Sequence, residues 1–382
     1  MVLHYRLCLE LNVIQLGLTN LERGIGERME KAAIFLGAGA SKSEGAPLQN
    51  ELFANYFGGE KYRSSHGAME KELASFFQFI FGINVDNDDL STVTFPTFEE
   101  ALGILDLAER RNEAFKEFDL QNNVPDSDRI RMLRQQLVLL MAKCIGDSLV
   151  HDNGYHHKLV NNLEKSNLLM DTTFISANYD ILIDNALANR YPDFSLDYGV
   201  EFTNFDKEGD WKRPKKNAVN LFKIHGSLNW CYCRTCNKLT LTPRDKGILR
   251  LITDPESLLC QECESLAVPV IVPPTFYKDM SNIFLGIIWN KTEQALRKAQ
   301  TIIFCGYSFP DADMHIKYLL KRIQTNRQIP LLKIVVCNHY TDKNKETAKE
   351  EEIRYKRFLG SKVKYEEVSF EQFANNPLMY IG

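Results

Sequence analysis

A short apolar run that leads directly into a glycine-rich turn constrains the fold of this chain more than any other feature. The run is Ala32–Leu36, and Gly37, Ala38 and Gly39 follow it at once. A continuous apolar stretch of this length, bounded by glycine, is typical of a strand buried on both faces, as strands are in a parallel sheet. The sequence therefore predicts a central parallel strand at this place.

Further apolar runs end in a similar way, at small, polar or proline residues. They are residues 220–224, 268–272, 301–305 and 332–337, and a further strand is expected at residues 171–176. Helical patterns lie between strands, and residues 50–160 show helical patterns alone. Strands that alternate with helices predict an α/β fold, a Rossmann-like doubly wound parallel sheet, here with a large helical insertion. In such sheets the ligand binds beyond the carboxyl ends of the strands.

Composition and charge narrow the class of protein. The chain has 382 residues, of which 44% are hydrophobic and 25% charged, as in ordinary globular proteins. The formal net charge of -4 argues against a dedicated nucleic-acid binder, which would carry a basic excess. No apolar run is long enough to span a bilayer, and the N-terminal segment lacks the apolar core and cleavage site of a signal peptide. We therefore expect a cytoplasmic protein that binds neither membrane nor nucleic acid.

Four of the nine cysteines form two CxxC pairs, which predict a metal site. Cys233 and Cys236 are separated by 23 residues from Cys260 and Cys263. Each pair brings two thiolates together, and two pairs complete the tetrahedral zinc site of a zinc ribbon, predicted over residues 229–268. Four cysteine ligands leave no open coordination position, so the zinc would be structural. Cys231 is a further thiol close by.

Polar residues at the ends of two predicted strands are candidates for chemistry. Asn178 and Asp180 follow the second strand, and His225 follows the third. Asn and Asp can bind sugar hydroxyls or a water molecule, but they also cap helices, and Asp180 could cap the helix that follows. The pKa of a histidine suits general base chemistry at neutral pH, although a lone histidine is more often structural.

The glycine turn and the ends of two later strands are candidates for ligand binding. Glycines before a helix let a phosphate approach backbone amides, but a GxG alone could be a tight turn without a ligand. Gly306, Ser308 and Asn338 end two further strands at the same predicted edge of the sheet. Each of these could also be a simple turn.

Taken in order, these motifs resemble the SIR2 (sirtuin) family. The resemblance covers roughly residues 31–339 and rests on GAGAS, SANYD, KIHGSLNW, the two CxxC pairs, FCGYSFPDAD and VVCN. The GYSF-x-D-x-D segment makes the chain most similar to SIR2-like NAD hydrolases of bacterial anti-phage defence. The resemblance implies a SIR2-like NAD-binding domain over residues 31–340, between an N-terminal extension (1–30) and a C-terminal segment (341–382).

The resemblance also implies roles for individual residues. Asn178 and Asp180 would lie beside the nicotinamide ribose, and His225 would be the catalytic histidine that contacts the ribose hydroxyls. The remaining cofactor-binding residues would hold the pyrophosphate, the adjoining ribose and the adenosine side: Gly37, Ala38, Gly39, Ser41, Gly306, Ser308 and Asn338. The four paired cysteines would match the zinc ribbon of the family.

The chain departs from deacylating sirtuins where they continue Gly-Ile-Pro-Asp-Phe-Arg. Here Gly45–Asn50 reads GAPLQN, and Ala177 replaces the usual glutamine. The resemblance therefore implies an NAD hydrolase that gives nicotinamide and ADP-ribose as the effector of a defence system. An NAD-dependent protein deacylase and a module that senses NAD or ADP-ribose are the alternatives. A homo-oligomer and a HerA-type ATPase partner are further expectations, with the insertion and residues 1–30 as candidate assembly surfaces.

Overall fold

The computed structural model describes most of the chain after residue 29. The described residues are 30–59, 62, 67–115, 126–149, 153–190, 195–204, 212–214, 217–242, 259, 260, 262–272, 282–327, 331, 333–340 and 345–381. The predicted N-terminal extension, residues 1–30, lies outside this part of the chain except for its last residue. In the described part, no helix is long and apolar enough to cross a membrane.

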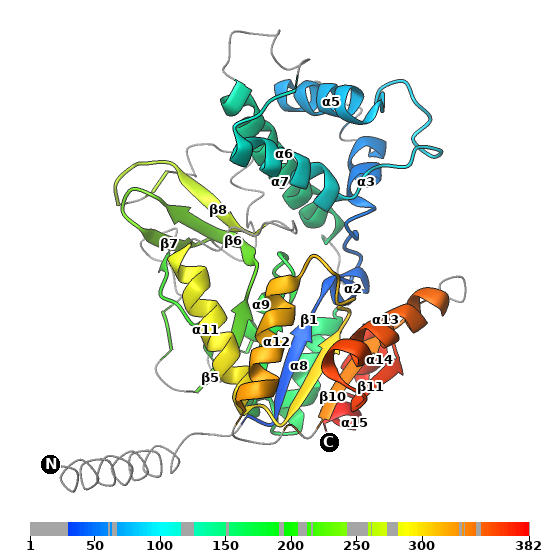
Figure 1. Cartoon of the computed structure of the whole chain (residues 1–382). Helices are drawn as coiled ribbons and strands as arrows, with labels where there is room; N and C mark the ends of the chain where they lie inside the picture. Colours follow the sequence, from blue (N-terminus) through cyan, green and yellow to red (C-terminus); the bar gives the residue numbers. More distant parts are fainter. Residues whose placement is uncertain are drawn as a thin grey trace, which may run out of the picture.

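The body of the molecule is a seven-stranded parallel sheet with the strand order β11-β10-β9-β1-β2-β5-β3 (Figure 1). The strands are β1 (Ala32–Leu36), β2 (Thr172–Ser176), β3 (Ser195–Asp197), β5 (Ala218–Lys223), β9 (Thr301–Cys305), β10 (Lys333–Asn338) and β11 (Val363–Glu367). The predicted parallel α/β sheet is confirmed, and β1 begins and ends at the predicted residues. The strand predicted at residues 268–272 instead pairs antiparallel in a second sheet.

The central strand β1 lies at the point where the order of strands along the chain reverses. Its last residue, Leu36, pairs with Ser176 of β2 on one side and with Cys305 of β9 on the other. Every residue of these three strands is buried, as in strands covered on both faces, and β1 is apolar throughout. The turns after the three strands therefore meet at one edge of the sheet, where ligands bind in doubly wound folds.

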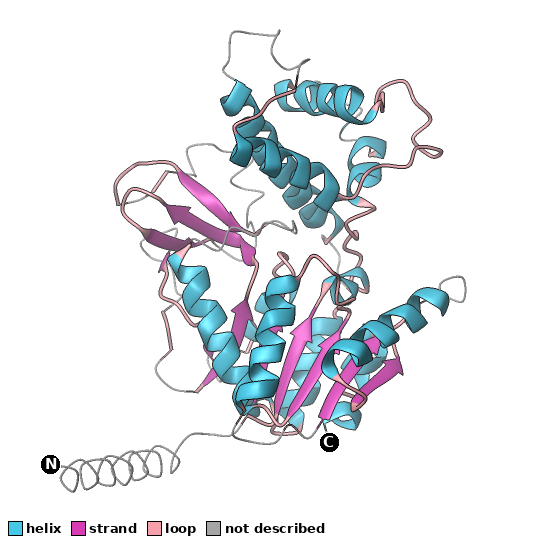
Figure 2. Cartoon of the chain, in the orientation of Figure 1, coloured by secondary structure: helices cyan, strands magenta, loops and turns pink. Residues whose placement is uncertain are grey.

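Helices cover both faces of this sheet (Figures 1 and 2). On one face α11 (Ile283–Lys298) contacts α12 (Met314–Asn326). On the other face α8 (Tyr155–Lys165) contacts both α9 (Leu182–Ala188) and α14 (Phe370–Asn375). Leu159, Val160 and Leu163 of α8 belong to the core of the sheet. The helical insertion was predicted for residues 50–160, but α8, which begins at Tyr155, already belongs to the main domain.

The segment after residue 340 is part of the same domain. It contains α13 (Lys345–Leu359), β11, α14 and α15 (Leu378–Ile381), and a short 3-10 helix (Leu169–Asp171) precedes β2 elsewhere in the domain. Charged residues dominate the sequence of α13, yet Glu351 and Tyr355 are fully buried in it. The parallel sheet therefore continues beyond the predicted domain boundary.

A second, smaller sheet and the helical insertion lie beyond the carboxyl edge of the main sheet (Figure 2). The small sheet has the order β4-β7-β6-β8, and the insertion begins after a short helix that follows β1. These elements are β4 (Thr203–Asn204), β6 (Gly226–Cys233), β7 (Lys238–Leu241), β8 (Ala267–Ile271), α2 (Ala38–Lys42), α3 (Leu52–Gly58), α5 (Ala68–Phe81), α6 (Phe98–Arg111) and α7 (Asp126–Ser148).

The insertion and the small sheet share one hydrophobic core. Phenylalanines from α3, α5 and α6 form its centre, with ring centroids of Phe53 and Phe77 4.7 Å apart. Leu228 and Cys231 of β6 and Ala267 of β8 belong to the same cluster. Burial of this common apolar surface holds the insertion on the small sheet.

Candidate active site

A cavity of about 350 Å³ lies beyond the carboxyl ends of β1, β2, β5 and β9. Of the predicted site residues, those that line it are Gly37, Ala38, Ser41, Asn178, Asp180, His225, Gly306 and Ser308. Gly39 and Asn338 are not among the described residues that line it. The structure thus brings residues that are far apart in the sequence to one cavity, as the predicted sheet edge requires.

Asn178, Ser41 and Asp180 form a hydrogen-bonded chain at the centre of the cavity. The Nδ2 amide of Asn178 donates to the carbonyl of Gly37 and to Ser41 Oγ, both at 2.8 Å. Ser41 Oγ in turn donates to Asp180 Oδ2 at 2.5 Å, and Asp180 Oδ1 accepts the N–H of Leu182 at 3.1 Å. Both donors of the Asn178 amide are therefore used, which leaves its Oδ1 as an acceptor.

His225 stands between the main sheet and the small sheet. It follows β5 and precedes β6, and only 4% of its surface is exposed. Its Nδ1 lies 3.2 Å from the carbonyl oxygen of Ala177. A carbonyl can only accept, so this contact assigns the proton to Nδ1 and makes Nε2 the basic nitrogen of the neutral ring.

A buried ion pair beneath the cavity was missed by sequence reasoning. Lys223 is fully buried, and its Nζ donates to the backbone carbonyl of Asp180 and to Asp184 Oδ2, the latter at 3.0 Å. Asp184 Oδ1 also accepts the hydroxyl of Tyr198 at 2.7 Å. A lysine at the end of an otherwise apolar buried strand was the available signal, because a buried lysine requires a partner.

The glycines of the two turns let these turns touch. A Cβ atom on Gly37 would lie 2.6 Å from the carbonyl oxygen of Gly306, and one on Gly39 would lie 2.7 Å from Gly306 Cα. The N–H groups of Gly37 and Gly39 donate to the carbonyls of Cys305 and Gly306 at 2.9 and 2.7 Å. The structure thus gives the glycines a packing role, and their role in ligand binding stays a prediction.

Replacement of Gly306 by alanine is expected to destabilise the protein by about 2–5 kcal/mol. Its φ of +63° is left-handed, and a Cβ would lie 2.1 Å from the backbone nitrogen of Ala40. Gly286→Ala on α11 is the matched control, because nothing lies within 4 Å of its added Cβ. Denaturant unfolding measures both variants. Equal midpoints for Gly306→Ala and the parent would contradict the close contact.

The turn after β9 is held from behind by three donors. Asn338 Nδ2 and the hydroxyl of Tyr355 both donate to the carbonyl of Tyr307, at 3.0 and 2.6 Å, and Arg354 Nη2 donates to the carbonyl of Ser308 at 2.8 Å. Asn338 also donates to the fully buried Glu351. Asn338 therefore supports the turn that lines the cavity, and a direct contact with a ligand stays a prediction.

Several residues that line the cavity were not singled out from the sequence. Tyr179 and Asp313 lie inside motifs that were recognised, whereas Glu99 and Met141 come from the insertion. Burial raises the pKa of Tyr179 well above its usual value, with smaller contributions from Asp313 and Glu99, so its hydroxyl stays protonated and donates to the carbonyl of Val272 at 2.7 Å. No sequence signal showed that the insertion returns to the sheet edge.

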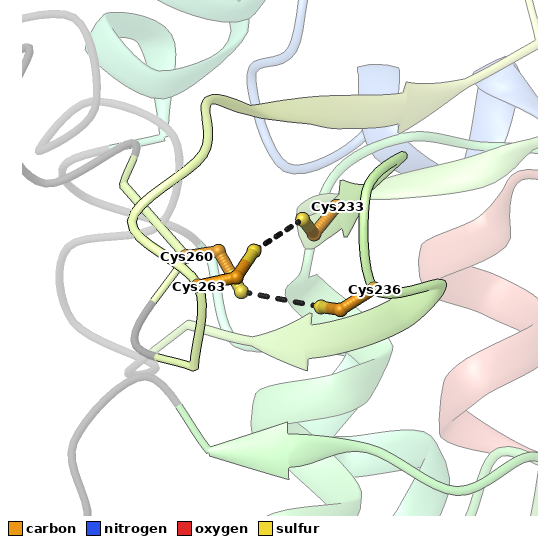
Figure 3. A group of neighbouring side chains, drawn as sticks. All are labelled: Cys233, Cys236, Cys260 and Cys263. Carbon is orange, nitrogen blue, oxygen red and sulfur yellow. Dashed lines mark hydrogen bonds between the residues drawn. The ribbon is translucent and has the colours of Figure 1, made fainter.

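The four paired cysteines form a cluster at the far end of the small sheet (Figure 3). All four sulfur atoms lie within 4.8 Å of one another, and the pairs Cys233–Cys263 and Cys236–Cys260 are 3.5 Å apart. Zinc with Zn–S bonds of about 2.3 Å needs sulfur separations of about 3.8 Å. The cluster therefore fits a tetrahedral zinc ion, whereas Cys231 is not part of it.

The local environment already favours a thiolate at one of these cysteines. The backbone N–H of Cys236 is the largest influence that lowers the pKa of Cys233, to about 6. Burial and hydrogen bonds to neighbouring thiols raise the pKa of Cys236 to about 12. Four adjacent thiolates repel one another without a cation, so a bound zinc ion would supply the charge that lets all four deprotonate.

Comparison with known proteins agrees with this geometry. Residues 172–355 match the family model described as a SIR2-like domain, and no curated protein matches the chain. The matched residues include Asn178, Asp180, His225 and all four paired cysteines. The glycine turn precedes the match, yet Gly37 and Ser41 bond directly to Asn178 inside it. This part of the chain is therefore similar to SIR2-like domains, which points to an NAD-related activity.

Proposed function

We propose that the protein is an NAD hydrolase that cleaves the bond between nicotinamide and ribose to give nicotinamide and ADP-ribose. One observation carries the proposal: Asn178, Asp180 and His225 line the same cavity as the glycine turn at the switch point of the sheet. The SIR2-like domain match supports the use of NAD.

The arrangement suits the cleavage of a glycosidic bond with a cationic leaving group. Such reactions pass through an oxocarbenium-like state that requires a held ribose and a placed nucleophile. Asn178 Oδ1 would accept a hydrogen bond from the attacking water, because the two amide donors are already used. His225 would polarise a ribose hydroxyl through Nε2. Asp180, bonded to Ser41 and to Leu182, would hold the turn that carries Asn178.

Water is the proposed acceptor because the stretch that departs from deacylating sirtuins lines the cavity. Ala46, Pro47, Leu48, Gln49 and Asn50 all contribute to its wall. Deacylating sirtuins have Asp-Phe-Arg in the corresponding stretch, and this chain does not. Without the side chains expected beside an acyl-lysine, solvent is the natural nucleophile.

Release of nicotinamide from NAD by the purified full chain is the test. We expect nicotinamide and ADP-ribose in equal amounts, with no requirement for an acylated peptide. The assay is run alone, with an acetylated-lysine peptide, and with a candidate partner added. Strong acceleration by the peptide with transfer of its acyl group would instead indicate a deacylase. Tight binding of NAD without turnover in every arm would indicate a sensing module.

The proposal extends to a role in the cell. Unregulated hydrolysis of NAD would be toxic, so the enzyme would be silent until triggered, as the NAD-depleting effector of an anti-phage defence system. It would act as a homo-oligomer with a HerA-type ATPase as partner. Light scattering that shows only monomers at working concentration, alone and with the ATPase, would argue against this assembly.

A further inference from the structure

A single segment of chain holds the backbone of the turn that carries Asn178 and Asp180. This turn, residues 177–181, follows β2 and is called the β2 turn here. The segment is residues 223–228, where β5 ends and β6 begins. It contacts three carbonyls of the turn: His225 Nδ1 lies 3.2 Å from that of Ala177, the N–H of Leu228 donates to that of Tyr179 at 2.8 Å, and Lys223 Nζ donates to that of Asp180.

Lys223 reaches the β2 turn from directly beneath it. It is the last residue of β5 and pairs in register with Ser176, the last residue of β2. Its side chain is fully buried, and Nζ also bonds to Asp184 Oδ2 at 3.0 Å. Asp184 lies in the first turn of α9, the helix that follows the β2 turn. One ammonium group therefore joins the turn to the helix after it.

A buried lysine is a costly way to fill this position. Leu221 and Phe222 precede it on β5 and are buried apolar residues. An ion pair often fails to repay the free energy of burying its two charges, so an apolar side chain would serve packing as well or better. An apolar side chain would, however, offer no donor to the carbonyl of Asp180. What the lysine adds at this position is therefore its hydrogen bond to the β2 turn.

The place of the Asn178 amide depends on this turn. The amide donates to the carbonyl of Gly37 and to Ser41 Oγ, both at 2.8 Å. These contacts orient the side chain, whereas the backbone of the turn is held from residues 223–228. Displacement of a catalytic group by about 1 Å can lower a rate about 100-fold. The turn must therefore be fixed for Asn178 Oδ1 to accept a water molecule at the right place.

We infer that Lys223 is a positioning residue, whose ammonium group fixes the β2 turn and, through the turn, the amide of Asn178. The inference rests on the proposed function and adds a residue to it. Lys223 is not among the described residues that line the cavity. It therefore acts through the backbone of Asp180 and not on the substrate.

The experiment compares two variants of the full chain, Asp184→Asn and the double variant Asp184→Asn with Lys223→Met. Lys223→Met alone would leave the carboxylate of Asp184 buried without its cation, which is strongly destabilising in itself. Asp184→Asn keeps the lysine as a donor to the carbonyl of Asp180, and the double variant removes it. Thermal unfolding verifies that both are folded. Lys223→Gln in the same Asp184→Asn background is a second variant, which keeps a polar side chain that is one bond shorter.

The first measurement is amide hydrogen exchange without NAD. We expect the N–H of Leu182, which donates to Asp180 Oδ1 at 3.1 Å, to exchange about tenfold faster in the double variant than in Asp184→Asn, as follows from the loss of one charged hydrogen bond. The N–H of Gly37, which donates to the carbonyl of Cys305 at 2.9 Å, is the internal control and should exchange at the same rate in both. A merely structural role of Lys223 would speed exchange at both places.

The second measurement is nicotinamide release from NAD. We expect kcat to fall about 10–100-fold from Asp184→Asn to the double variant, with KM changed less than about threefold, because the change affects the placed water and not the binding of the dinucleotide.

Each outcome decides the inference. Faster exchange confined to the β2 turn, together with the fall in kcat, supports it. Equal kcat in the two variants, equal exchange, or faster exchange at Gly37 as well overturns it. A parent chain that releases no nicotinamide overturns the proposed function, and the exchange measurement alone then decides whether Lys223 holds the turn.

Discussion

Replacement of His225 by alanine is expected to reduce the rate of NAD cleavage by about 10²–10⁴-fold, the usual contribution of a general acid or base. The imidazole is held by the carbonyl of Ala177 with Nε2 as its basic nitrogen, and it lines the cavity beside Asn178. The measurement is nicotinamide release per chain. His315→Ala is the matched control, because His315 is exposed on α12 and does not line the cavity.

Asn178→Ala is expected to reduce cleavage to a similar extent for a different reason. The amide of Asn178 ties the β2 turn to Gly37 and Ser41, so its loss removes both the acceptor for water and a link between two turns. Thermal unfolding separates the two effects, because His225→Ala leaves this link in place. Cleavage by both variants at the rate of the parent would show that the reaction occurs elsewhere.

Loss of the metal site is expected to lower the stability of the protein strongly. The purified chain should contain about one zinc ion, and Cys260→Ser should lose it with a fall in the free energy of unfolding of at least about 3 kcal/mol. Cys233 and Cys260 belong to the core that joins the small sheet to the insertion. Removal of zinc should therefore also weaken the wall that carries Glu99. Metal analysis and denaturant unfolding measure the two effects.

Cys231→Ala is the control for the zinc prediction. Cys231 is buried in β6 close to the cluster, and burial raises the pKa of its thiol to about 12, so it stays a neutral core residue. This variant should keep its zinc. A Cys260→Ser variant with the zinc content and stability of the parent would show that the four cysteines do not form a structural zinc site.

The parts of the fold that sequence could predict are those with a local signal. The strand Ala32–Leu36 was visible because its five residues are all apolar and a glycine turn follows, and the cysteine cluster was visible because its ligands lie in two short motifs. The strand β11 was missed because it lies at the edge of the sheet and alternates charged and apolar residues, as in Val363–Glu367. Such a pattern resembles an exposed segment.

The site residues that directly follow strands could be predicted from the sequence. Those that tertiary packing brings in from the insertion could not. Asn178, Asp180 and His225 could be brought together by reasoning because parallel strands share one carboxyl edge. Glu99 could not, because the direction in which a helical insertion returns depends on tertiary packing. The position of Lys223 at the end of a buried strand was a usable signal, but its partner Asp184 lies on a different element and could not be identified in this way.

The order of the strands also has a consequence for biosynthesis. Strand β1 emerges early from the ribosome, but its two neighbours begin at Thr172 and Thr301, so the middle of the sheet stays open until most of the chain has been made. An unpaired apolar strand invites association with other chains during that interval. The same delay applies to the cavity: among its described lining residues, those from Gly306 to Asp313 are made last, so its wall stays incomplete until the segment after β9 has been synthesised.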